Sequence, residues 1–343
     1  MQRRDLLRGL TALGIIGTWP PGVMGKDSGG AVSVESLPAL EGELTLYLGR
    51  GEGGLYEDVI EAIRKRNPDL SLNVRRGPTV ALANTIVAEA QAGARRADLF
   101  WAVDSGSLGL VSEAGLASPV RDELSSQLRS GYRYRDWAPI SGRVRTLAYN
   151  TEAVDPDRIP DTIMALPETD LNVGWAPAYG SFQSFVTAMR LLEGNRATRD
   201  WLRGMQGKSR EFAGELGVVM GVSRGEVDLG LANHYYSLRL RAGKPDAPVA
   251  LAFTREDAGS LLNASGVMAL RDTDLAHNFM RYLLTREVQE FLVHEAYEIP
   301  MVSGIAMPEG LPARDRIRPP ALELTRLADV RPTLELMREA GVL

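Results

Sequence analysis

The chain has 343 residues, of which 44% are hydrophobic and 24% charged, a composition typical of a soluble globular protein of one or two domains. Its formal net charge of -5 argues against a nucleic-acid-binding protein, which would present a basic domain or stripe. Cysteine is absent, which excludes disulfide bonds, thiolate metal sites and cysteine nucleophiles.

The first residues contain the parts of a bacterial export signal. Arg3 and Arg4 precede a short apolar run over 9–19, and adjacent arginines in this position are typical of the twin-arginine type. The run is too short to span a bilayer as an ordinary membrane helix, and no later segment reaches that length. We therefore predict an export signal over 1–25, a Gly- and Ser-rich linker over 26–42, and a periplasmic protein that is tethered to the membrane only if the signal is not cleaved. The alternative is a surface helix whose two arginines are adjacent by chance.

From Glu43 the pattern of apolar residues alternates between strand and helix. Short apolar runs indicate strands, and apolar residues at helical spacing indicate helices. The predicted elements of this first block are strands over 44–48, 70–74 and 97–103 and helices over 55–63 and 86–93. Alternating units of this kind form a parallel sheet covered by helices, and ligands bind outside the carboxyl ends of its strands.

A second block with the same alternation begins near Arg143. Its predicted elements are strands over 173–176 and 227–231 and a helix over 182–192. A strand over 265–270 then returns to the first block, and helices follow over 279–284 and 288–294. The sequence therefore predicts an α/β protein of two lobes, joined by two crossing strands, with a cleft that closes on a ligand by hinge motion. The predicted lobes are 43–142 with 264–310, and 143–263 with 311–343.

Several short segments in a fixed order carry a resemblance to a known family. They are Ala97–Phe100, Ser141–Arg145, Gly225–Asp228, Asn233–Tyr236, Asn263–Val267 and Tyr297–Pro300. In order and spacing they are similar to the periplasmic ferric-ion-binding proteins of bacterial ABC importers, over essentially the whole chain after the linker. The resemblance implies the type II periplasmic-binding-protein fold, a monomer without enzymatic activity, and delivery of a small ligand to a permease in the inner membrane.

The adjacent tyrosines Tyr235 and Tyr236 are the most diagnostic part of this resemblance. In the resembling proteins both phenolates coordinate Fe(III), a hard cation that favours anionic oxygen and can displace a phenol proton. The resemblance therefore implies that both tyrosines are iron ligands. Without the resemblance, the favoured interpretation is different: adjacent side chains diverge, and the pair reads as amphipathic packing residues whose hydroxyls reach water.

Two positions depart from the ligands that the family supplies. Where the loop after the first strand of the family has His or His-Tyr, this chain has Gly51 and Glu52. Glu52 is either an oxygen ligand that replaces the lost phenolate or a solvated loop acid. After the third strand, where some members have a ligand Glu, this chain has Val103 and Asp104. Asp104 is either an acceptor that supports the metal ligands or, as we favour, the N-cap of the next helix.

The synergistic anion of the family corresponds to a region around Tyr179, Gly180 and Ser181. Backbone amides at a helix N-terminus, together with the Ser181 hydroxyl, can bind phosphate or carbonate. Tyr179 is alternatively a further phenolate ligand, and Asn233 matches an anion contact of the family. Another expected Asn is Gly214 here. These departures leave a second hypothesis open, in which the ligand is a small anionic organic solute, phosphorylated or not, without metal.

The sequence also contains two patterns that resemble enzyme motifs. Gly49, Gly51 and Gly54 form a G-x-G-x-x-G pattern between a strand and a helix, so an exported NAD(P)-dependent oxidoreductase, with Arg75 and Arg76 placed to meet a 2'-phosphate, is a distant alternative. A G-x-S-x-G pattern around Ser223 lacks the strand-before, helix-after context of a nucleophile elbow. The three histidines have no ligand spacing to one another.

Overall fold

The computed structural model describes residues 30–49 and 54–343, which form two compact units. Unit 1 comprises the chain up to Gly142 together with Ala264–Pro308, and unit 2 comprises Arg143–Asn263 together with Glu309–Leu343. The chain passes from one unit to the other within strand β4 (Ala138–Asn150), within strand β9 (Leu262–Ala269) and after Pro308. Each unit has its own mixed α/β architecture.

The sheet of unit 1 contains the strands predicted over 44–48, 70–74, 97–103 and 265–270, together with the short strand β10 (Ile299–Pro300), which was not predicted. β1 (Gly42–Gly49) lies between β2 (Leu70–Gly77) and β3 (Leu99–Ala102) and pairs with both in parallel. β9 pairs antiparallel with β3, and β10 (Ile299–Pro300) pairs antiparallel with β4. All four residues of β3 are buried, as expected for a central strand with helices on both faces.

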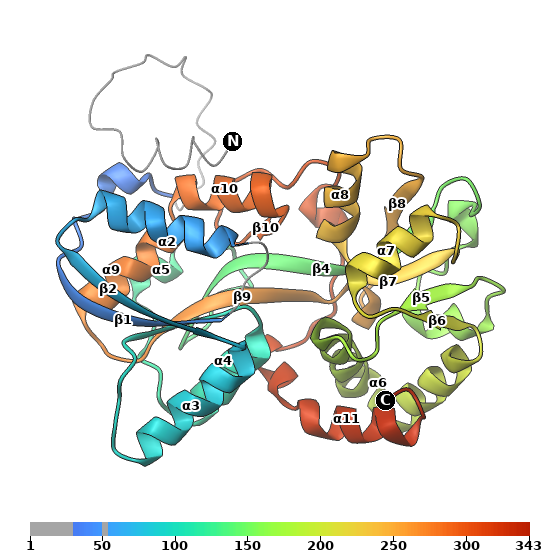
Figure 1. The fold of residues 1–343 in the computed structure, drawn as a ribbon, viewed down its shortest axis with the longest axis horizontal. Coiled ribbons are helices and arrows are strands. Elements are labelled where there is room, and N and C mark those ends of the chain that lie inside the picture. The colour runs from blue at the N-terminus through green and yellow to red at the C-terminus, as the bar shows by residue number, and fades with distance from the viewer. Residues whose placement is uncertain (1–29, 50–53) are drawn as a thin grey trace. The chain divides into compact units, whose positions relative to one another are not determined.

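Helices cover both faces of this sheet (Figure 1). They are α2 (Leu55–Arg66), α3 (Thr79–Gln91), α4 (Ser105–Glu113), α5 (Asp122–Ser125), α9 (Asp274–Leu283) and α10 (Arg286–Ala296). α2, α9 and α10 pack on one face through a core that contains Leu46, Ile63 and Phe291, while α3 and α4 lie on the other face. Burial of each such side chain contributes about 1.5–3 kcal/mol, so this core is the main source of stability in unit 1.

The segment predicted as a linker, 26–42, differs from the expectation where the structure describes it. From Gly30 onward it packs into unit 1, and Val34 and Leu40 are at most 1% exposed. The Ser33 hydroxyl and the Val34 amide donate to the Glu287 carboxylate at 2.7 and 3.0 Å. The buried apolar residues recur every third position, at Ala31, Val34, Leu37 and Leu40, a pattern that the Gly and Ser content obscures. The predicted export signal over 1–25 lies outside the described residues.

Unit 2 has a sheet in the order β4-β7-β5-β6, with β8 (Val249–Ala252) on the other side of β4. β7 (Leu229–Asn233) pairs antiparallel with β4 and parallel with β5 (Val173–Trp175), which pairs in parallel with β6 (Ser209–Glu211). All five residues of β7 are buried. The strand predicted over 227–231 therefore exists but ends two residues later, at Asn233.

Four helices complete unit 2: α6 (Gly180–Gln206), α7 (Glu215–Ser223), α8 (His234–Gly243) and α11 (Val330–Glu339). α6 is interrupted at Gly194, whose φ of 85° breaks the helical backbone. α11 packs on α6, where the hydroxyls of Thr187 and Thr333 are 3.0 Å apart. Short 3-10 helices lie at Val34–Ser36, Pro156–Arg158, Ile163–Glu168, Ala258–Ser260, Arg314–Arg316 and Leu324–Ala328. Within the part of the chain that the structure describes, no helix is both long and apolar enough to cross a bilayer.

Candidate functional site

The paired tyrosines occupy the first turn of α8. β7 ends at Asn233 and the helix begins at His234, so the strand-to-helix junction directly precedes Tyr235 and Tyr236. Tyr235 is 2% exposed and Tyr236 is 7% exposed, and their ring centroids are 4.5 Å apart. The two adjacent side chains therefore share one buried environment, whereas the interpretation made without the family resemblance had them diverge.

A third tyrosine joins this pair from a distant part of the sequence. Tyr179 precedes α6 as its N-cap residue, and its hydroxyl oxygen lies 2.9 Å from the hydroxyl oxygen of Tyr236. A Cβ on Gly214 would lie 3.9 Å from the Tyr179 ring, which is ordinary van der Waals contact, so Gly214 adjoins this tyrosine. Tyr179, Tyr235 and Tyr236 are called the tyrosine cluster below.

Polar groups connect the tyrosine cluster to the start of α6. The Asn233 amide nitrogen donates to the Ser181 hydroxyl at 3.0 Å and to the Tyr235 hydroxyl at 3.4 Å. The Arg145 guanidinium also donates to the Ser181 hydroxyl, at 3.1 Å. Because Ser181 accepts two hydrogen bonds, its own hydrogen remains to be donated to a further acceptor. Together with Gly180 in the first turn of α6, this hydroxyl can bind an oxygen of an anion.

A buried ion pair lies next to these groups, and the sequence analysis did not identify it. The side chains of Arg145 and Glu215 are 2% and 0% exposed, and Arg145 Nη1 donates to Glu215 Oε1. Arg145 Nη2 also donates to the Leu231 carbonyl at 3.0 Å, and Glu215 Oε2 accepts the backbone N–H of Asn233 at 2.9 Å. The sequence contains one sign of this pair. Arg145 is a charged residue two positions before the buried Leu147, so on a strand both side chains lie on the same face.

A second cation lies over the ring of Tyr235. The guanidinium carbon of Arg239 is 4.6 Å from the centroid of that ring, within the range of a cation–π interaction. This positive charge adds attraction for a negatively charged oxygen on the same tyrosine. The neighbouring His234 is fully buried, and its Nδ1 accepts the Val144 amide at 3.2 Å, so it contributes to packing against β4.

Asp104 serves as the N-cap of α4, which confirms the interpretation that we favoured. One carboxylate oxygen accepts the Ser107 amide at 2.8 Å and the other accepts the Ser107 hydroxyl at 3.1 Å. Asp104 belongs to unit 1, whereas the tyrosine cluster belongs to unit 2. Glu52 lies outside the described residues, so its role stays a prediction. Among the residues that are described, no group of three or more His, Asp or Glu side chains could hold a metal ion.

The enzyme motifs do not gain support from the structure. Arg75 donates to the Glu89 carboxylate at 3.0 Å, and Arg76 makes two hydrogen bonds to the Glu57 carboxylate at 2.6 and 2.7 Å. The arginines considered for a 2'-phosphate are therefore paired with carboxylates of unit 1. Ser223 is the last residue of α7, so a helix precedes the G-x-S-x-G pattern, as the sequence indicated.

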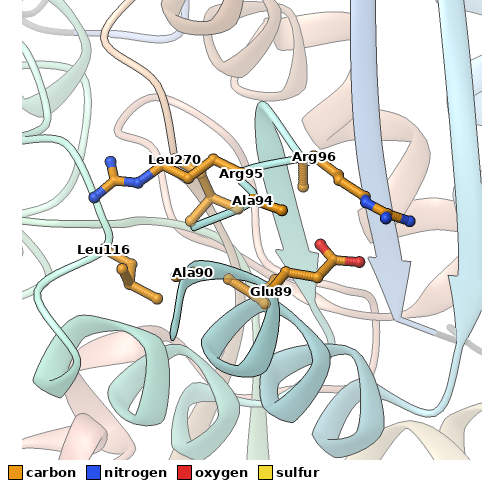
Figure 2. Close-up of a pocket in the computed structure, with 9 residues that line it drawn as sticks. Glu89, Ala90, Ala94, Arg95, Arg96, Leu116 and Leu270 are labelled. Carbon is orange, nitrogen blue, oxygen red and sulfur yellow. The ribbon is translucent and has the colours of Figure 1, made fainter. Parts of the chain in front are cut away.

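A separate hollow in unit 1 lies between α3 and the segment before β3 (Figure 2). Its empty volume, open solvent at its mouth included, is about 250 Å³. The residues that line it are Ile86, Glu89, Ala90, Ala94, Arg95, Arg96, Ala97, Leu116 and Leu270. The side chains of Arg95 and Arg96 point away from each other, and none of the predicted site residues lines the hollow. The tyrosine cluster is therefore a better candidate for the ligand-binding site than this hollow.

Comparisons with known proteins show the family to which the chain belongs. The family model for bacterial extracellular solute-binding proteins matches residues 49–290. The chain is 27% identical to the Fe(3+)-binding periplasmic protein of Serratia marcescens over 290 residues, which cover 81% of this chain and 85% of that protein. Among solved structures, iron-bound HitA from Pseudomonas aeruginosa has a TM-score of 0.76 at 27% identity and covers 89% of this chain and 100% of its own.

The Trichodesmium protein IdiA (FutA), solved in complex with iron and citrate, has a TM-score of 0.74 at 22% identity and covers 88% of this chain and 100% of its own. At that identity it is evidence for the fold alone. The prediction of the type II periplasmic-binding-protein fold is confirmed by this likeness and by that to HitA.

Proposed function

The chain belongs to the family of bacterial extracellular solute-binding proteins, and we propose that within this family it captures Fe(III) with a synergistic anion for delivery to an ABC permease in the inner membrane. The tyrosine cluster is the observation that carries the proposal. Fe(III) is a hard cation that favours anionic oxygen ligands, and the cluster offers phenol oxygens that become phenolates when they bind it. The iron-binding relative from Serratia marcescens and iron-bound HitA support the same ligand.

The anion is proposed to bind at the first turn of α6. There the Ser181 hydroxyl has a hydrogen to donate, and Gly180 and Ser181 are positioned where a helix N-terminus favours negative charge. Asn233 holds Ser181 and Tyr235 together and so connects this anion site to the metal ligands. Phosphate or carbonate is the proposed anion, since either can bind a cation and a hydroxyl donor at once.

Of the two other predicted ligands, Glu52 is kept in the proposed site and Asp104 is not. Glu52 is proposed as an oxygen ligand from the loop after β1. Asp104 is assigned to capping α4 and is left out of the proposed ligand set, because both of its carboxylate oxygens accept hydrogen bonds from Ser107. A periplasmic location and a carrier role without catalysis follow from the proposal, and they agree with the names of the iron-binding relatives.

An anionic organic solute without metal is the second hypothesis, and the charges weigh against it. Arg145 donates to Ser181, but its charge is neutralised by Glu215. A buried anion needs a cationic partner or several donors, and among the described residues Arg239, over the Tyr235 ring, adds one positive charge. A bound Fe(III) would add three positive charges beside the anion, which favours the metal-bound hypothesis.

A titration with chelated Fe(III), followed by visible absorption, tests the proposal. The parent protein should develop a phenolate-to-iron charge-transfer band when phosphate or carbonate is present. Tyr235→Phe and Tyr236→Phe should each weaken or abolish the band. Tyr149→Phe is the matched control, because Tyr149 lies on β4 opposite Leu229, at the other end of β7 from the cluster. Absence of colour in the parent protein would rule out the ferric site.

A further inference from the structure

The buried ion pair of Arg145 and Glu215 connects every segment that carries a residue of the tyrosine cluster. Arg145 lies on β4 and donates to Ser181 on α6 and to the carbonyl of Leu231 on β7. Glu215 begins α7 and accepts the backbone amide of Asn233, the residue directly before α8. Tyr179 immediately precedes α6, and the other two tyrosines follow β7 within α8. One ion pair therefore fixes the start of α6 relative to the start of α8.

From this arrangement we propose that Arg145 and Glu215 are positioning residues, which hold the tyrosine cluster in the geometry that binds the ligand. The ion pair would set the distance between Tyr179, on one segment, and Tyr235 and Tyr236, on the other. With respect to iron it rests on the function proposed above. Neither side chain is proposed to touch the metal, because both carboxylate oxygens of Glu215 already accept hydrogen bonds from protein groups.

Energetic considerations favour positioning over simple stabilisation. Removing two charges from water is costly, and apolar residues of similar volume often stabilise a fold as well as a buried ion pair does. Arg145 Nε is also buried without a hydrogen-bond partner among the residues that the structure describes, while the guanidinium lies 5.0 Å from the centroid of the Phe185 ring. Arg145 and Glu215 therefore contribute little to stability for the cost of burying their charges. They make directed hydrogen bonds to both segments that carry the tyrosines, so they are suited to fixing the geometry of the cluster.

The test uses the full chain with the paired substitution Arg145→Met and Glu215→Leu. This variant removes both charges together, so that neither is left buried alone, and it removes the hydrogen bonds to Ser181, Leu231 and Asn233. Its Fe(III) affinity should fall about 10- to 100-fold, the range seen when groups that orient metal ligands are replaced. The maximum of the charge-transfer band should also shift, because the phenolate geometry changes.

A matched control comes from a second ion pair in unit 2. Arg190 on α6 donates to the Asp329 carboxylate at 2.6 Å and to the Thr333 hydroxyl at 3.0 Å. The paired substitution Arg190→Met and Asp329→Asn should alter stability but leave the band maximum and the affinity unchanged. If the Arg145 and Glu215 variant is folded and has the band and affinity of the parent, the positioning role is wrong.

A second measurement needs no iron and separates the two proposals. Tyr179→Phe removes the contact between the hydroxyls of Tyr179 and Tyr236. In the parent protein, Tyr179→Phe should lower the denaturant midpoint of unfolding. In the protein that already carries Arg145→Met and Glu215→Leu, it should have little further effect, because the contact between the two hydroxyls is already lost. Equal shifts in both backgrounds would overturn the positioning role, whether or not the protein binds iron. A coupled result without iron binding would keep the positioning role and reject only the ferric ligand.

Discussion

The hydroxyl oxygens of Tyr179 and Tyr236 lie 2.9 Å apart, although 57 residues separate the two tyrosines in the sequence. The contact joins the residue before α6 to the first turn of α8, two segments that carry separate parts of the proposed site. A metal that binds both oxygens must displace the hydrogen between them. Proton release is therefore a direct consequence of the proposed ligand set.

Replacing Tyr179 by Phe should reduce the number of protons released on Fe(III) binding by about one, since a free phenol has an ordinary pKa of about 10 and loses its proton when it becomes a ligand. For the same reason the affinity for Fe(III) rises with pH, and it should rise less steeply in Tyr179→Phe. Calorimetric titration in buffers of different ionisation enthalpy measures the proton count. An unchanged count would mean that Tyr179 is not a ligand.

Asp104 should tolerate loss of its charge but not loss of its capping oxygen. Asp104→Asn keeps an acceptor for the Ser107 amide, and Asn is as good an N-cap as Asp, so stability and iron affinity should both stay close to the parent. Asp104→Ala should lower the free energy of unfolding by about 0.5–2 kcal/mol. Chemical denaturation and chelator competition measure the two quantities. A large loss of iron affinity in Asp104→Asn would assign the carboxylate to the metal site instead.

The segment before β1 should behave as part of the core. Leu40 is 1% exposed, and Leu40→Ala is expected to lower the free energy of unfolding by about 2–5 kcal/mol through lost burial and the cavity left behind. Leu343→Ala is the control, because Leu343 is 43% exposed and its change should stay within about 0.5 kcal/mol. Similar midpoints for the two variants in denaturant would show that the segment is a linker after all.

Stability should fall as the pH falls below about 6.5, in part because of His277. Burial, followed by the nearby Arg121 guanidinium, lowers the pKa of this histidine, and Asp272 opposes the shift. The unfolded chain therefore binds a proton at a higher pH than the folded protein does. The contribution of neutral His277 is fully present above the unfolded pKa and is lost as the pH falls towards the folded value.

Denaturant midpoints at neutral and mildly acidic pH measure this effect. His277→Gln should reduce the loss between the two pH values, whereas His294→Gln should not, because His294 is exposed in the last turn of α10. If both variants lose as much stability as the parent, His277 does not contribute to the pH dependence.

Local patterns were sufficient to predict much of the fold. Apolar runs and helical spacing predicted β1, β2 and β3 and the helices between them, because each element is specified by its own residues. The paired tyrosines were predicted as ligands only through the family resemblance, because local sequence alone favoured packing residues. The Gly and Ser content of the segment predicted as a linker was misleading, because composition did not show its apolar residues at every third position.

The rest of the candidate site depends on contacts between distant residues. Arg145 and Glu215 are 70 positions apart, and no short motif links them. The contact between Tyr179 and Tyr236 likewise exists only once the tertiary structure of unit 2 brings the residue before α6 to the first turn of α8. Sequence patterns name the residues with the right chemistry, whereas their distances follow from the tertiary structure.

Tyr179, Tyr235 and Tyr236 are proposed to bind one ferric ion together. Anomalous diffraction at the iron absorption edge, from crystals of the iron-loaded protein, tests it most directly. We expect a single strong anomalous peak within bonding distance of all three phenol oxygens. A peak bonded to other residues, or no peak at the tyrosine cluster in fully loaded crystals, would contradict it.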